Sequence, residues 1–208
     1  MASIGGFILL LVIAMLLPRF FALIEAKPGM RLNDPVLELI GPEDVSAITF
    51  AILYTAVLGG MIVLLLLPYR FVRMMHAYAF LLLFRMITMF LVTLEAPATI
   101  IPLIDPITQI FYPADVPFLK DLFFSGHTAT AVLFALAVGG HWARWPIGMG
   151  AALVGSLVIL QHVHYSIDVL AAPFFATLAW ACAKFSMERC GVKERANGYF
   201  DRLGRRFR

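Results

Sequence analysis

Two residues four positions apart, His164 and Asp168, have the types and the spacing for nucleophilic catalysis. On a helix, residues at positions i and i+4 share one face about a turn apart. A carboxylate placed there can hold the imidazole tautomer and stabilise the imidazolium, which leaves the other ring nitrogen free to attack. The pair therefore predicts that His164 is a nucleophile and that Asp168 orients it.

A second histidine, His127, follows Ser125 and Gly126 where a helix is expected to begin. A helix N-terminus presents free N–H groups and partial positive charge, so it can seat a phosphate. A histidine beside that phosphate can protonate a leaving alkoxide and later deprotonate an incoming hydroxyl. Arg85 would neutralise phosphate oxygens. Together these residues indicate a metal-free phosphoryl-transfer site with a phosphohistidine intermediate, and no cofactor is expected.

Further polar residues surround this set. Glu95 and Asp121 fall in an outer loop, where their carboxylates could orient the second histidine or bind a cationic headgroup amine; ordinary loop solvation is the alternative. Arg85 taken alone could pair with either carboxylate for packing. Asp34, in the first outer loop, is a minor candidate for a headgroup contact. His162 is expected to face away from the nucleophile.

The elements that must position these residues are membrane helices. The 208-residue chain is 62% hydrophobic and only 14% charged, with a mean hydropathy of +0.90, whereas a soluble domain carries roughly 25% charged residues. A helix needs about 20 mostly apolar residues to cross the hydrocarbon core. Six segments qualify or nearly do, and they are Ile4–Ile24, Val45–Leu67, Met74–Leu94, Gly126–His141, Pro146–Val163 and Ser166–Ala183.

The fold class predicted is all-α, a single polytopic domain over residues 1–208. The first segment lacks a basic n-region and a clear cleavage site, so we expect a retained helix rather than a signal peptide. Oligomeric state stays open, because lipid-facing and partner-facing apolar stripes look alike when lipid is the solvent.

The distribution of charge predicts the orientation, because Lys and Arg favour short cytoplasmic loops. The second and fourth loops and the tail (residues 184–208) are basic, while the first and third loops are acidic. Both termini are therefore predicted to be cytoplasmic, with the tail against anionic headgroups. Arg85, His127 and the His164–Asp168 pair then gather at the periplasmic or lumenal side, with Arg85 about 13 Å below the outer end of its helix.

Three segments carry a family resemblance. Residues 121–128 read Asp-Leu-Phe-Phe-Ser-Gly-His-Thr, residues 164–169 read His-Tyr-Ser-Ile-Asp-Val, and residues 85–94 form an arginine-led segment before them. Their order and placement resemble the sphingomyelin synthase family, within the wider type-2 phosphatidic acid phosphatase superfamily. The resemblance implies six helices with an outward-facing site, where His164 is the nucleophile, Asp168 orients it and His127 is the general acid and base.

The same resemblance implies that a headgroup phosphate passes from a donor phospholipid to a lipid alcohol such as ceramide or diacylglycerol. The broader phosphatases carry a lysine-led motif ending in Arg-Pro and a Ser-Arg pair before their second histidine, and this sequence has neither, which favours a transferase. Glu95-Ala96-Pro97 stands where animal members have Leu-Pro-x-Pro, so the headgroup stays open. The compact chain suggests a bacterial member, placed in the inner membrane with its site facing the periplasm.

Three other interpretations compete with this one. A lipid phosphate phosphatase would use the same residues with water as the acceptor. A lipid transporter could use the intramembrane ionisable residues as a binding site or proton relay, although internal repeats and interrupted helices are not evident. A metal site could be built from His162, His164, Asp168 and His127, although Arg85 nearby would repel a cation. A nucleic-acid partner is not expected.

Overall fold

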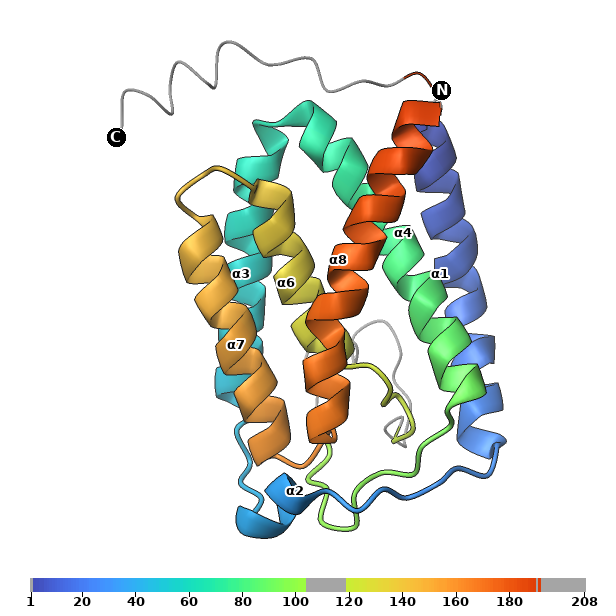
Figure 1. Cartoon of the computed structure of the whole chain (residues 1–208), viewed down its shortest axis with the longest axis vertical. Coiled ribbons are helices and arrows are strands. Elements are labelled where there is room, and N and C mark those ends of the chain that lie inside the picture. Colours follow the sequence, from blue (N-terminus) through green and yellow to red (C-terminus); the bar gives the residue numbers. More distant parts are fainter. Residues whose placement is uncertain (1, 104–118, 190, 192–208) are drawn as a thin grey trace.

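The computed structural model describes residues 2–103, 119–189 and 191, and in this part of the chain it is helical (Figure 1). The helices are α1 (Ala2–Ala26), α2 (Pro35–Leu39), α3 (Ser46–Leu65), α4 (Pro68–Leu91), α6 (Gly126–Val138), α7 (Arg144–Leu160) and α8 (Ser166–Arg189). Two predictions fall outside the described residues: the acidic Asp105 and Asp115 of the third loop, and most of the basic tail, including Arg202, Arg205, Arg206 and Arg208.

All six predicted segments contain a helix, and four of these helices are long and apolar enough to cross a membrane. The four are Gly6–Ala26, Ser46–Leu65, Pro68–Leu91 and Ser166–Arg189. The helices α6 and α7 are apolar but shorter, with 13 and 17 residues. The molecule is therefore built as a polytopic membrane protein.

Several helix ends differ from the prediction. The third segment begins at Pro68 rather than Met74, because a proline at the first helical position has its φ angle already set for a helix. Arg70 and Arg73 therefore lie in the first turns of α4 instead of a loop. At the other end of α6, the helix stops at Val138 rather than His141, because Gly139 adopts a φ of 58° that other residues rarely take.

The long helices run roughly along one axis and form a bundle (Figure 1). The start of α1 and the end of α8 lie at one end of this bundle, whereas α8 begins at the opposite end, near the short α2, and α6 begins further inside the bundle toward that same end. We call that opposite end the site end. It holds the predicted catalytic residues, because each stands in or just before the first turn of α6 or α8.

Helix α6 is the centre of the bundle and packs against α3, α4, α7 and α8. Small residues make this packing close. On α8, the fully buried residues include Ala172, Ala176, Ala179 and Ala183, at helical spacing. Gly60 of α3 lies against the Phe134 ring of α6, where a β-carbon would come within 2.6 Å. In lipid, helix contacts depend on such close approach because apolar side chains gain little from leaving a hydrocarbon solvent.

Candidate active site

The first turn of α6 forms one side of the site. Ser125 caps this helix, since its hydroxyl accepts a weak hydrogen bond from the Thr128 N–H at 3.5 Å and lies 3.1 Å from the Thr128 hydroxyl. His127 follows in the same turn, with its ring edge-on to the Phe50 ring of α3 at a centroid distance of 5.8 Å. The capping serine is neutral, so the partial positive charge of this helix end is not cancelled by the cap.

The His164–Asp168 pair forms the opposite side. The His164 Nδ1 lies 3.4 Å from the Asp168 Oδ2, which also accepts a hydrogen bond from the Tyr165 N–H at 3.1 Å. Both side chains are almost fully buried, with 1% and 0% exposure. Because the carboxylate lies at Nδ1, the Nε2 atom of His164 is the nitrogen left to react with a substrate.

A direct backbone contact joins these two sides. The Ser125 N–H donates to the Asp168 carbonyl oxygen at 3.1 Å, so the helix starts of α6 and α8 are fixed together. The rings of His127 and His164 then lie 6.4 Å apart between centroids, which is close enough for both to reach one phosphoryl group. The structure thus brings together the three residues that the sequence predicts as a triad.

Gly155 of α7 permits this junction. A β-carbon at Gly155 would lie 2.8 Å from the Val169 Cγ1 of α8 and 3.4 Å from the Thr128 Cγ2 of α6. These two neighbours follow directly after Asp168 and His127 in the sequence. The missing side chain therefore lets α6, α7 and α8 meet at the level of the triad.

Arg85 reaches the same place from α4. Its guanidinium donates to the Phe124 carbonyl oxygen and forms an ion pair with Asp121, and its side chain is 93% buried. It also lies against Gly126, where a β-carbon would come within 2.7 Å of the Arg85 Cζ. The Arg85 guanidinium stands beside the positive end of α6, and its ion pair with Asp121 offsets part of its charge. Of the two outer-loop carboxylates, Asp121 is the one paired with Arg85.

The N-terminus of α8 is electrostatically different from that of α6. Asp34, from the segment before α2, accepts from the Ser166 N–H at 2.6 Å and from the Ser166 hydroxyl at 3.1 Å. The Asp168 carboxylate accepts a hydrogen bond from the nearby Tyr165 N–H. Two carboxylates therefore occupy the start of α8, so a phosphate is favoured at the start of α6 instead.

Glu95, the other outer-loop carboxylate, pairs with a lysine and not with Arg85. Its carboxylate pairs with the Lys120 ammonium at 2.8 Å and accepts from the Gly29 N–H at 2.9 Å. The hydrogen bond from Lys120 and then that from Gly29 hold the pKa of Glu95 below its ordinary value. These contacts fasten the loop after α4 to the segments that follow α1 and precede α6.

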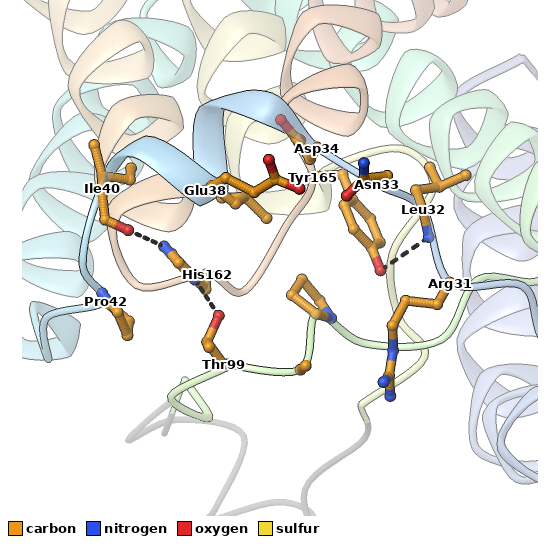
Figure 2. Close-up of a pocket in the computed structure, with 13 residues that line it drawn as sticks. Arg31, Leu32, Asn33, Asp34, Glu38, Ile40, Pro42, Thr99, His162 and Tyr165 are labelled. Atoms are coloured by element: carbon orange, nitrogen blue, oxygen red, sulfur yellow. Dashed lines mark hydrogen bonds between the residues drawn. The ribbon is translucent and has the colours of Figure 1, made fainter.

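The structure also places His162 away from the triad, as predicted. Its ring bridges the Thr99 hydroxyl, at 2.5 Å, and the Ile40 carbonyl oxygen, at 3.1 Å (Figure 2). The next buried polar residue, Gln161, binds Ser46 at 2.8 Å and the Ile101 carbonyl oxygen at 3.2 Å. Within the described part of the chain, no three His, Cys, Asp or Glu side chains are grouped closely enough to hold a metal ion.

An open cavity of about 420 Å³ lies on the outer side of the turn between α7 and α8 (Figure 2). It is lined by residues 31–34, 37, 38, 40, 42, 97–99, 162 and 165, so the triad does not line it. The Tyr165 hydroxyl donates to the Glu95 carbonyl oxygen at 2.9 Å and accepts from the Leu32 N–H at 3.3 Å, and burial raises the pKa of this hydroxyl. The cavity walls are thus segments that cap the site end.

The sequence did not indicate Phe50, and it indicated Asp34 only as a minor candidate for a headgroup contact, not as a partner of Ser166. Phe50 contacts the His127 ring, but it reads in the sequence as one more apolar residue of α3. Asp34 binds Ser166 across 132 positions of sequence, and no local pattern indicates that pairing. The Asp-Pro step at residues 34–35 does signal a helix start, and Asp34 indeed caps α2 through the Val36 N–H at 3.0 Å.

Part of the chain matches a known protein family. Residues 120–185 match the family described as PAP2 superfamily C-terminal, and this segment contains His127, His164 and Asp168. The match supports membership of the type-2 phosphatidic acid phosphatase superfamily, whose members are typically phosphatases or phosphotransferases. No curated protein matches the chain.

Proposed function

We propose that the chain is a membrane phosphotransferase that moves a phospho-headgroup from a donor phospholipid to a lipid alcohol, ceramide or diacylglycerol. The observation that carries the proposal is the pair of neighbouring histidine rings, His127 and His164. Asp168 lies at the Nδ1 of His164, and Arg85 lies beside the start of α6. The resemblance of the three motif segments to the sphingomyelin synthase family supports the transferase branch.

In the first half of the reaction, the Nε2 of His164 attacks the donor phosphorus. The bond from phosphorus to the lipid oxygen breaks, and protonated His127 gives its proton to the departing oxygen. Asp168 stabilises the positive charge that develops on His164. Arg85 and the N–H groups of the first turn of α6 bind the phosphoryl oxygens, whose charge rises in the transition state.

In the second half, neutral His127 removes the proton from the incoming lipid hydroxyl. That oxygen attacks the phosphorus of the phosphohistidine, and the P–N bond breaks to return His164 to its starting state. The departing lipid oxygen and the incoming lipid hydroxyl occupy the same position in turn, so one general acid and base serves both halves. Water in place of the lipid alcohol would turn the same cycle into hydrolysis, which releases the phospho-headgroup from a phospholipid or inorganic phosphate from a phosphomonoester lipid.

Six membrane passes and an outward-facing site are part of the proposal. The short helices α6 and α7 would complete the spans, which places both chain ends on the cytoplasmic side. Exposed Trp142 and Trp145, with Arg144 between them, stand at the turn between α6 and α7, at the end remote from the site. Tryptophan and arginine are typical of a membrane interface, and arginine favours the cytoplasmic one. A bacterial inner membrane with a periplasmic site fits this arrangement.

The test is lipid mass spectrometry on purified wild type, His164→Ala and Asp168→Asn, each incubated with mixed phospholipids, ceramide and diacylglycerol. We expect wild type to make a new phospholipid, His164→Ala to make none, and Asp168→Asn to keep a small residual rate, because it removes only the charge that supports the imidazolium. The matched control is His141→Ala, an exposed histidine at the opposite end of the bundle.

Each alternative gives a different result. Release of a free phospho-headgroup with no new lipid would show hydrolysis in place of transfer, and release of inorganic phosphate from a phosphomonoester lipid would make the protein a phosphatase. Normal turnover by a folded His164→Ala variant would rule out the phosphohistidine. No lipid conversion by wild type, together with movement of lipid across vesicles, would favour the transporter.

A further inference from the structure

Thr49, in the first turn of α3, carries a buried hydroxyl with no hydrogen-bond partner among the described residues. Its side chain is fully buried, and its Oγ1 makes no hydrogen bond within residues 2–103 and 119–189. A threonine inside a helix can satisfy its hydroxyl with the carbonyl four residues back, as Thr55 does on the same helix with the Ala51 oxygen at 2.7 Å. An unsatisfied buried hydroxyl is unfavourable, so the Thr49 hydroxyl has the capacity to bind a partner that the described residues do not supply.

The register of the helices places Thr49 at the level of the general acid and base. Leu53 of α3 and Ala131 of α6 lie in one hydrophobic cluster. Thr49 stands one turn nearer the site end than Leu53, and His127 stands one turn nearer the site end than Ala131. The neighbour of Thr49 on α3, Phe50, contacts the His127 ring directly.

The adjoining hydroxyl on α3 is already engaged. Ser46, one turn before Thr49, accepts from the Gln161 amide at 2.8 Å and donates to the Asp44 carboxylate at 2.7 Å. Its contact with Gln161 joins the start of α3 to the end of α7, at the site end. Thr49 therefore remains as the hydroxyl of this helix turn with capacity for a ligand.

The two sides of His127 have different tasks. On the α4 side, Arg85 lies against Gly126 and is placed to bind phosphoryl oxygens. On the α3 side lie Phe50 and Thr49. In the proposed reaction, His127 exchanges its proton with the lipid alcohol, and that alcohol must lie away from the oxygens bound by Arg85. The α3 side is therefore the position of the alcohol.

We propose that Thr49 is an alcohol-binding residue, whose hydroxyl hydrogen-bonds the oxygen of the lipid alcohol while His127 takes or gives its proton. The inference rests on the proposed function. It names the hydroxyl-bearing polar end of a ceramide or diacylglycerol as the ligand of Thr49. Water needs no such contact to reach the phosphohistidine, so Thr49 favours transfer over hydrolysis.

The experiment compares wild type with Thr49→Val, which keeps the shape and removes the hydroxyl. Both are assayed in phospholipid vesicles containing ceramide and diacylglycerol, and new phospholipid, free phospho-headgroup, acceptor KM and Tm are measured. We expect the ratio of transfer to hydrolysis to fall about 3- to 10-fold, as for loss of one neutral hydrogen bond. The acceptor KM should rise, Tm should stay level or increase, and Thr49→Ser should retain the wild-type ratio. Thr55→Val is the matched control.

The results distinguish the binding role of Thr49 from the proposed function on which it rests. If wild type makes no new phospholipid, the proposed function fails, and the binding role of Thr49 fails with it. If wild type is active and Thr49→Val has the same ratio and acceptor KM, only the role of Thr49 is overturned. Equal losses of transfer and hydrolysis with a lower Tm would make Thr49 a structural residue. Should Thr49→Val not fold, Thr49→Ser and Thr49→Ala give the same comparison, because they differ only in the hydroxyl.

Discussion

The Arg85 guanidinium lies directly against Gly126, so closely that a β-carbon there would come within 2.7 Å of the Arg85 Cζ. This contact explains the glycine between Ser125 and His127. The serine caps the helix, the histidine is the general acid and base of the proposed reaction, and the glycine leaves space for an arginine that comes from another helix. The three neighbouring residues thus have three different physical tasks.

Gly126→Ala should therefore displace Arg85 without changing any charged group. We expect turnover to fall roughly 10- to 100-fold, since an error of about 1 Å in a positioned group can cost that much. Steady-state kinetics in vesicles would measure the effect. Gly59→Ala is the control, because a β-carbon at Gly59 of α3 meets nothing within 4 Å. Equal activity in the two variants would mean that Arg85 does not act on the substrate.

Gly155→Ala should separate α8 from α6 and α7. The added carbon would lie 2.8 Å from the Val169 side chain, so Val169 and the neighbouring Asp168 must shift. Overpacking of this kind costs about 1–3 kcal/mol, and we expect a lower Tm together with reduced turnover. Gly148→Ala tests the same helix where the nearest contact would be an ordinary 4.0 Å. A loss of stability in both variants would refute a specific role for Gly155.

Asp34 should make the stability of the site end sensitive to acid. Burial raises the pKa of its carboxyl, but the hydrogen bonds from Ser166 and Val36 outweigh burial and hold the pKa below its ordinary value of 3.8. A group with a lowered folded pKa stabilises the fold above its ordinary pKa and loses this contribution as the pH falls through the folded pKa. Wild type should therefore lose Tm below about pH 3.8.

Asp34→Asn should be less stable than wild type at neutral pH, by about 0.5–2 kcal/mol for a damaged helix cap, and the difference should shrink in acid. Thermal unfolding between pH 3 and 7 would measure it. Glu38→Gln, which changes an exposed carboxylate on α2, should leave the acid dependence in place. If Asp34→Asn kept the full acid dependence of wild type, the contact with Ser166 would not be its source.

The sequence predicted the gathering of the candidate catalytic residues because each of them is unusual for its place. A charged Arg85 and a His164–Asp168 pair are costly inside an apolar chain, and the place of the pair at the start of a helix followed from counting residues. Helix ends were less predictable, since Pro68 and Gly139 move them by several residues. The pairing of Asp34 with Ser166 could not be predicted, because it joins distant segments through ordinary polar residues.

The shortness of α6 has a consequence for where the reaction takes place. Its 13 residues rise about 20 Å, which is about 10 Å less than the thickness of a hydrocarbon core. With the α6–α7 turn at the cytoplasmic interface, the proposed site lies below the plane of the outer headgroups. A lipid that reacts there sinks its phosphate into the membrane, while the hydroxyl of a second lipid meets it without leaving the bilayer. The enzyme would then respond to bilayer thickness, because a thinner membrane brings the headgroups down to the histidines.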